Sequence, residues 1–218
     1  MLKALVYKEL RETGWIALIA LLAYAGFAVT CAGHQVLPMF GAENHGVPFL
    51  GGSFSGSMGM VSFCFVISLA IRQTTVESSR GTWLFLLHRP LSRAWIVAMK
   101  LAVGLGLYLG CSAATILAYA AWAAQPGRHP SPFYWWMTAD VWENWAILTL
   151  LYFGMFLTGI RPARWFGTRL LPLVAMMAIS LFVGGFPGCR GLRLAIVVLI
   201  GAAMASIILY VAQTRDYS

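Results

Sequence analysis

Apolar residues along this chain gather in long runs, and short polar segments separate one run from the next. The runs cover about residues 15–32, 52–71, 95–118, 145–160, 170–186 and 194–212. About 20 consecutive apolar residues form an α-helix that crosses the ~30 Å hydrocarbon core of a bilayer. The pattern therefore predicts one all-α domain over residues 1–218, a polytopic membrane helical bundle with about six transmembrane helices. The second run, rich in glycine, and the fourth, which is short, fit this pattern least well.

The composition supports a membrane location. Hydrophobic residues make up 60% of the chain and charged residues only 10%, whereas a soluble domain has about 25% charged residues. A soluble fold of this length could not cover its surface with so few charges. Tryptophans at positions 135, 136, 142 and 145 are typical of the aromatic belt at a membrane interface.

Lysine and arginine residues predict the orientation of the bundle. Of the 15, only Arg128, Arg190 and Arg193 lie in connections on one side, and the other 12 lie on the opposite side. Because positive residues favour the cytoplasmic side, we expect a plasma (inner) membrane protein with both termini cytoplasmic, as an even number of spans requires. The net charge of +8 is attributed to this topology. Nucleic acid is not an expected partner, because the basic residues lie at helix ends and not on one folded face.

The N-terminal segment, about residues 2–13, has the pattern of an amphipathic helix at the membrane surface. One helical face carries the apolar residues Leu2, Leu5, Val6 and Leu10. The opposite face carries the charged residues Lys8, Arg11 and Glu12. Glu9 falls towards the apolar face, where an unpaired carboxylate is costly. It either pairs with a basic residue of the next segment on the same side or reaches the lipid headgroups. Because the segment mixes acids and bases, we expect no cleavable signal peptide.

A second amphipathic segment, about residues 72–93, joins the second and third runs. Thr74 and Glu77 have the spacing of a capping box, Pro90 stops a helix, and Ser92 can cap the third span. The residues between begin polar and become apolar, and Gly81 permits a bend. The segment predicts a short helix along the membrane, and the alternative is an ordinary charged loop.

Candidate chemistry in the spans is sparse. Lys100 lies about one turn inside the third run and is expected to extend to the interface. The acids Asp140 and Glu143, near His129, form the one candidate acid cluster, either a metal site or a solvated loop. We therefore predict no catalytic residue and no metal site.

Cysteines and small residues leave further alternatives open. Cys31 and Cys189 either form a disulfide or are small packing residues. The small-residue pairs Gly106–Gly110 and Gly201–Ala205 have the four-residue spacing that permits close packing of helices.

Two segments resemble the ABC-2 type transporter permease family. Lys8-Glu9-Leu10-Arg11 is similar to the elbow helix before the first span of that family. The second segment resembles the stretch that the family has between spans two and three, at Glu77, Gly81, Thr82, Pro90, Ser92, Arg93 and Lys100. The two motifs cover about a fifth of the chain.

The resemblance implies a subunit that pairs as a homodimer or heterodimer with a second permease and is docked on ABC ATPase subunits. Contact with the ATPase is implied for the coupling residues Glu77, Arg80, Gly81 and Thr82, with Pro90, Ser92 and Arg93 at the end of the segment. The elbow residues Lys8, Glu9 and Arg11 would brace this contact. The re-entrant hairpin that the family has between spans five and six is hard to find in this chain.

The sequence thus leads to a functional hypothesis and an alternative. The chain contains no GxxxxGK[ST] phosphate loop, so ATP and Mg²⁺ are expected in the partner ATPase and no cofactor in this chain, which is not itself an enzyme. The hypothesis is an exporter permease for a hydrophobic or amphipathic substrate, in contact with membrane lipid. The alternative is a non-transporting membrane scaffold, or a permease-like subunit that serves the assembly of another membrane complex.

Overall fold

The computed structural model describes residues 2–32, 47–49, 52–79, 92–125, 132–161 and 166–214, and long α-helices dominate it. The elements are α1 (Leu2–Cys31), α2 (Ser53–Ser79), α4 (Arg93–Ala123), the 3₁₀ helix η1 (Trp135–Thr138), α5 (Ala139–Ile160), α6 (Phe166–Gly185) and α7 (Arg190–Thr214). In this part of the chain, six helical segments are long and apolar enough to cross a membrane. The prediction of an all-α protein with six long apolar helices that could span a membrane is confirmed.

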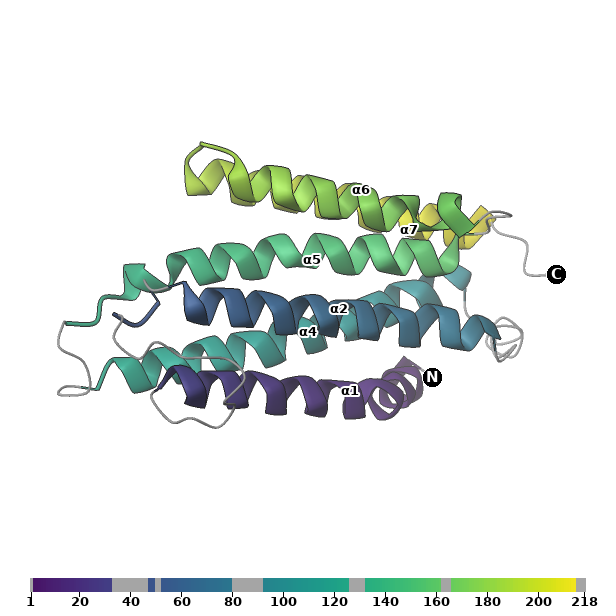
Figure 1. Cartoon of the computed structure of the whole chain (residues 1–218). Coiled ribbons are helices and arrows are strands. Elements are labelled where there is room, and N and C mark those ends of the chain that lie inside the picture. Colours follow the sequence, from purple (N-terminus) through teal and green to yellow (C-terminus); the bar gives the residue numbers. More distant parts are fainter. Residues whose placement is uncertain are drawn as a thin grey trace.

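The start of α1 and the end of α7 lie at the same end of the bundle (Figure 1). We call this the proximal end and the opposite one the distal end. The chain leaves α2 and α5 at the proximal end, and it leaves α1, α4 and α6 at the distal end. Six crossings with both ends on one side are the arrangement that the distribution of lysine and arginine predicts.

The fourth span, predicted as the short run 145–160, is the central helix of the bundle. It lies between the pair α6 and α7 on one side and α1, α2 and α4 on the other (Figure 1), and it contacts four other helices. The span covers Trp135–Ile160, because η1 and the first turns of α5 extend it. Polar residues in these turns, Asp140, Glu143 and Asn144, interrupt the apolar run and hide its true length.

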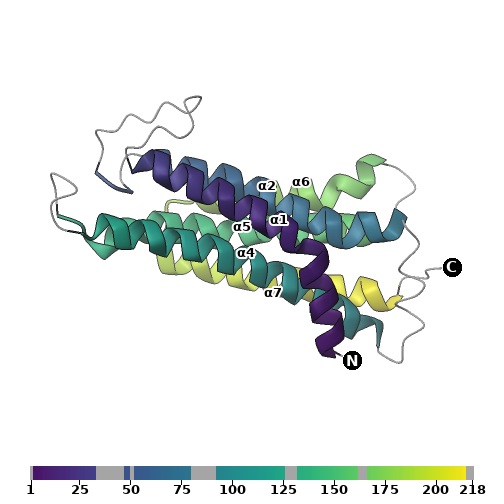
Figure 2. The same cartoon turned by 90° about the horizontal axis from the view of Figure 1, so that it is seen from below.

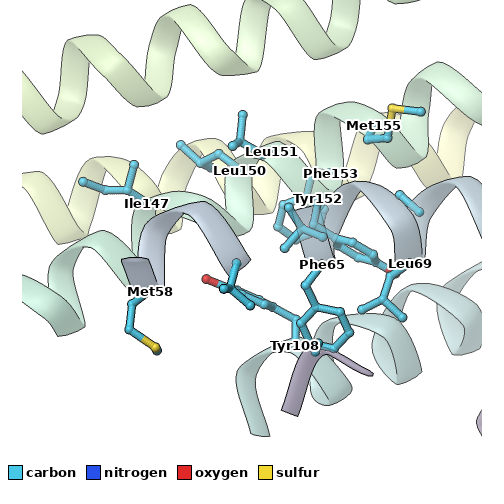
Figure 3. Close-up of a cluster of buried hydrophobic side chains, with 14 of the residues drawn as sticks. Met58, Phe65, Leu69, Tyr108, Ile147, Leu150, Leu151, Tyr152, Phe153 and Met155 are labelled. Atoms are coloured by element: carbon cyan, nitrogen blue, oxygen red, sulfur yellow. The ribbon is translucent and has the colours of Figure 1, made fainter. Parts of the chain in front are cut away.

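Aromatic and aliphatic side chains of α2, α4 and α5 form the core (Figure 3). The ring of Phe65 lies edge-on to Tyr108 with centroids 6.2 Å apart, and edge-on to Tyr24 at 6.3 Å. Edge-to-face contacts of this kind are the favoured geometry of aromatic pairs. Since lipid is as apolar as these side chains, close packing and hydrogen bonds must hold such helices together.

Glycines permit this close packing, but only one of the two predicted small-residue pairs contains a glycine that packs against another helix. Gly106 and Gly110 have open space beside them, so the prediction that they form a packing face is wrong within this chain. Gly201 does pack, 3.5 Å from Phe153 as measured from its would-be Cβ. The closest approach on α4 is at Gly104, where a Cβ would overlap the side chains of Tyr152 and Gln73.

Exposed aromatic side chains lie at both ends of the bundle. The predicted belt residues Trp135 and Trp136 are exposed at the distal end. Trp142 and Trp145 are not part of it: they are half-buried and pack edge-on against each other, and Trp145 Nε1 donates to Ser112 Oγ at 2.8 Å. Proximal aromatic residues that are also exposed are Tyr7, Trp15, Trp95 and Tyr210. Two such belts are typical of a protein that crosses a bilayer.

We predict that Gly104→Ala lowers the free energy of unfolding by about 1–3 kcal/mol, because the added methyl group overpacks the contact with Tyr152 and Gln73. The matched control is Gly106→Ala, two residues further along the same helix, where the methyl group meets open space. Thermal unfolding of the purified protein in detergent measures both. Equal stability of the two variants would contradict the packing described for α4.

Candidate functional site

Four polar side chains from four different helices meet near the proximal end, surrounded by apolar residues. They are Glu9 of α1, Gln73 of α2, Lys100 of α4 and Tyr152 of α5, and each is at most 1% exposed. We call this group the proximal polar cluster. Ionisable side chains buried within membrane spans are expensive and mark functional sites by default, so this cluster is the candidate site.

Glu9 reaches the cluster because of the face that α1 turns towards the bundle. Leu5, Glu9 and Thr13 share this face at four-residue spacing and are each 1% exposed. Leu5 packs with Ile96 and Met99 of α4. The predicted apolar face is therefore only partly right, since it joined Leu5 to Leu10, which is exposed.

The predicted elbow helix and first span form one continuous helix, α1 (Leu2–Cys31). Figure 2 shows that its first turns bend away from the rest of the helix and lie across the start of α4. Thr13 Oγ1 donates a hydrogen bond to the carbonyl oxygen of Glu9 at 2.6 Å. Such bonds from threonine to the carbonyl four residues earlier often bend helices, and Gly14 follows directly.

The central interaction of the cluster is an ion pair, with Lys100 Nζ 2.6 Å from Glu9 Oε1. Pairing of Glu9 with a basic residue of the next segment is thereby confirmed, and the alternative that Glu9 reaches the headgroups is wrong. The expectation that Lys100 extends to the interface is also wrong, because its side chain is 0% exposed. A carboxylate without a cation in this position would cost several kcal/mol, so each charge keeps the other buried.

Gln73 and Tyr152 extend the cluster to α2 and α5. Gln73 Nε2 donates to the backbone oxygen of Lys100 at 2.9 Å, and Tyr152 Oη donates to Gln73 Oε1 at 2.7 Å. Both ends of the Gln73 amide thus have a partner, as a buried amide requires. Gly104, one turn after Lys100, leaves the space that these two side chains occupy.

Weaker charge pairs lie around the cluster. Lys8 Nζ is 3.6 Å from Glu12 Oε1, and Arg72 is 3.9 Å from Glu12 Oε2. All three side chains are partly exposed, so these pairs contribute about 0–1 kcal/mol each. The Arg72–Glu12 pair nevertheless links α2 to α1 beside the cluster.

The structure describes only part of the predicted coupling segment. Arg80, Gly81, Thr82 and Pro90 lie outside the described residues, as does the side chain of Glu77. The helix α2 continues to Ser79, so residues 72–79 prolong the second span.

Two capping predictions have different outcomes. The predicted capping box is wrong, because Thr74 lies inside α2 and its hydroxyl donates to the carbonyl oxygen of Ala70 at 2.6 Å. The prediction for Ser92 is confirmed: it is the N-cap of α4, and its Oγ accepts from the backbone N–H of Trp95 at 3.4 Å. Of the remaining predicted residues, Arg11 and Arg93 are exposed.

The candidate acid cluster is part of a distal set of ion pairs. Arg193 Nε lies 2.6 Å from Glu143 Oε1, and Arg190 pairs with Asp140. Asp140 and Glu143 therefore act as partners for the arginines of α7 and join α5 to α7. Of the predicted alternatives, the solvated loop is wrong for Glu143, which is buried in α5. His129 lies outside the described residues, and among those described no group of three His, Cys, Asp or Glu could hold a metal ion.

Cys31 and Cys189 are free thiols, so the possible disulfide is not formed. Only residues 186–189 separate α6 from α7, which leaves no room for a re-entrant hairpin between them.

An apolar groove of about 550 Å³ runs between the distal halves of α1 and α4. Its walls include Leu21, Ala25, Val29, Ala114, Ala118 and Trp122. The groove holds no charged side chain among its lining residues. It is therefore suited to contact with an apolar molecule rather than to acid–base chemistry.

The geometry of the proximal polar cluster points to positioning, not catalysis. Its side chains satisfy one another with hydrogen bonds and are closed off from solvent. Neither Gln73 nor Tyr152 was predicted from the sequence. One signal did point to such residues, because polar residues inside or beside apolar runs need partners. That signal identified Glu9, but it could not say which helix would supply the partner of Gln73.

Comparison with models of known protein families, with curated proteins and with solved structures finds no match for this chain.

We predict that Lys100→Met lowers the free energy of unfolding by about 3–5 kcal/mol, because the carboxylate of Glu9 is left buried without a cation. The double variant Glu9→Leu with Lys100→Met should recover most of this loss, since apolar residues often replace a buried ion pair at little cost. Lys8→Gln, which alters a partly exposed pair on the same helix, serves as the control, with an effect of about 0–1 kcal/mol. Unfolding in detergent, followed by circular dichroism, measures all three. A Lys100→Met variant as stable as the control would show that the pair does not support the fold.

Proposed function

We propose that this chain is the membrane-spanning permease subunit of an ATP-driven ABC-2 type transporter. It would move a hydrophobic or amphipathic substrate, with energy from a separate ATPase subunit on the cytoplasmic side. The resemblance of residues 8–11 and 77–93 to that family motivates the proposal, and the arrangement of the helices next to these segments supports it.

The observation that carries the proposal is the proximal polar cluster. The Glu9–Lys100 pair and the hydrogen bonds of Gln73 join the first turns of α1 to α2 and α4. Of these, α2 and α4 lie on either side of the segment with the coupling motif. A push on that segment would therefore reach α1, α2, α4 and, through Tyr152, α5 together, as rigid-body transmission requires.

The length of α2 narrows the region in which an ATPase would bind. Because α2 extends to Ser79, residues 72–79 would carry force along a continuous helix. The contact itself would then lie at the end of α2 and in residues 80–91. The cap at Ser92 starts α4 directly after this stretch, so both of its ends are held by long helices.

The groove between α1 and α4 supports the proposed class of substrate. It is apolar, open at the surface of the bundle and about 550 Å³ in volume. A lipid-like or drug-like molecule would lose little solvation there, whereas a charged solute would find no partner on its walls. We propose this groove as one of the surfaces that the substrate contacts.

The test is a complex of this chain with the phosphate-loop ATPase encoded nearest to its gene. We expect Glu77→Ala with Arg80→Ala to lower ATP turnover of the complex about tenfold, the loss that corresponds to about 1.4 kcal/mol of contact free energy. The control is Asp140→Asn with Arg190→Gln, which removes an exposed ion pair at the distal end and should leave ATP turnover unchanged.

Two results would contradict the proposal. The first is that the chain, purified from membranes, binds no ATPase. The second is that both double variants leave the ATP turnover of a complex unchanged. Either result would favour the alternative of a membrane scaffold that serves the assembly of another complex.

A further inference from the structure

A stripe of alternating basic and aromatic residues runs along the outer face of the first turns of α1. Lys3, Tyr7, Arg11 and Trp15 follow one another at four-residue spacing, so they share one helical face. All four are exposed, with Tyr7 at 70% and Trp15 at 56%. We call this set the exposed stripe.

The proximal polar cluster determines which face of α1 carries this stripe. Because Glu9 is tied to Lys100, the face with Leu5, Glu9 and Thr13 is turned into the bundle. Positions two residues away from each of these lie on the far side of the helix. The stripe is thus held outward by a buried ion pair and is not free to rotate towards the protein.

The two cations of the stripe have no acidic partner among the described residues. Lys8, on a neighbouring face, pairs with Glu12, and Arg72 approaches the same carboxylate. No ion pair involves Lys3 or Arg11 in this part of the chain. Their positive charges therefore remain available to an anion from outside the chain.

The surface that continues the stripe indicates where that anion comes from. Further along α1, the same face carries Leu18 and Leu22, which are 57% and 63% exposed. These leucines belong to a helix that is apolar enough to cross a membrane, and in a membrane this exposed face would meet lipid. The stripe runs from this lipid-facing surface to the proximal end, where Trp95 of α4 is also exposed.

We propose that the exposed stripe binds the headgroups of anionic phospholipids in the leaflet at the proximal end. Lys3 and Arg11 would contact the phosphates, and Tyr7 and Trp15 would lie at the level of the headgroups, where amphipathic rings are most stable. Basic residues close to an anionic membrane surface each add to its binding. The site depends on the membrane location alone and not on the proposed transport function.

The experiment replaces Tyr7 with the photo-reactive residue p-benzoylphenylalanine, in the full chain and without any ATPase. The protein is placed in vesicles of phosphatidylcholine and phosphatidylglycerol in equal amounts and irradiated, and mass spectrometry identifies what is attached at position 7. We expect lipid adducts in which phosphatidylglycerol exceeds phosphatidylcholine.

Charge variants then test the recognition. Lys3→Gln with Arg11→Gln should lower the ratio of the two adducts, by about fivefold for each charge removed. The matched control is Lys8→Gln with Arg161→Gln, which removes two positive charges from the same end of the bundle but not from the stripe, and should change the ratio little. If the first double variant does not fold, added salt decides instead: it should lower the ratio for the unsubstituted stripe, since salt screens exposed charges.

Two outcomes would overturn the proposal. One is that both lipids are captured in equal amounts and that neither the charge variants nor salt changes the ratio. The other is that position 7 is joined to a second copy of this chain instead of lipid, which would make the stripe a contact between copies. Neither outcome bears on binding of the ATPase, so failure here is distinct from failure of the proposed function.

Discussion

A buried charge in an apolar bundle needs a partner of opposite charge, and this requirement organises the proximal half of the structure. Glu9 and Lys100 are 91 positions apart in sequence, and their side-chain atoms are 2.6 Å apart. Separating them would leave each charge in surroundings that cannot solvate it, at a cost of several kcal/mol. The pair therefore fixes the rotation of the first turns of α1 and the place where they cross α4. Leu5, Ile96 and Met99 then fill the space beside it.

The two ends of the bundle use charge in different ways. At the proximal end, a single closed pair lies beside hydrogen bonds from Gln73 and Tyr152, and four helices are joined through it. At the distal end, Asp140 and Arg190 remain largely exposed and only Glu143 is buried. The distal pairs hold α7 to α5 but leave α1, α2 and α4 untouched. A rigid proximal end is what a subunit driven from that side would need.

The sequence predicted the spans well because long apolar runs have few alternatives in a membrane. It failed where a span carries polar residues: the run at 145–160 looked short, since Asp140 and Glu143 in its first turns looked like a loop. It also failed for contacts between helices. Apolar spacing could not tell that Gly104 faces Tyr152 while Gly106 faces outward, because both lie in a uniformly apolar stretch. The position of Glu9 towards the apolar face was predicted from its own helix, but whether it pairs, and with which residue, depends on how α1 crosses α4.

The most direct test of this account is whether the first turns of α1 dock on α4 with the face that the ion pair selects. The four native cysteines are replaced by alanine, and Leu5→Cys is combined with Ile96→Cys in membranes under mild oxidation. We expect a disulfide in this variant and little or none in the control, Leu10→Cys with Ile96→Cys, because Leu10 lies on an exposed face of the same helix. Cross-linking of the control and not of the Leu5 variant would mean that Glu9 does not orient α1.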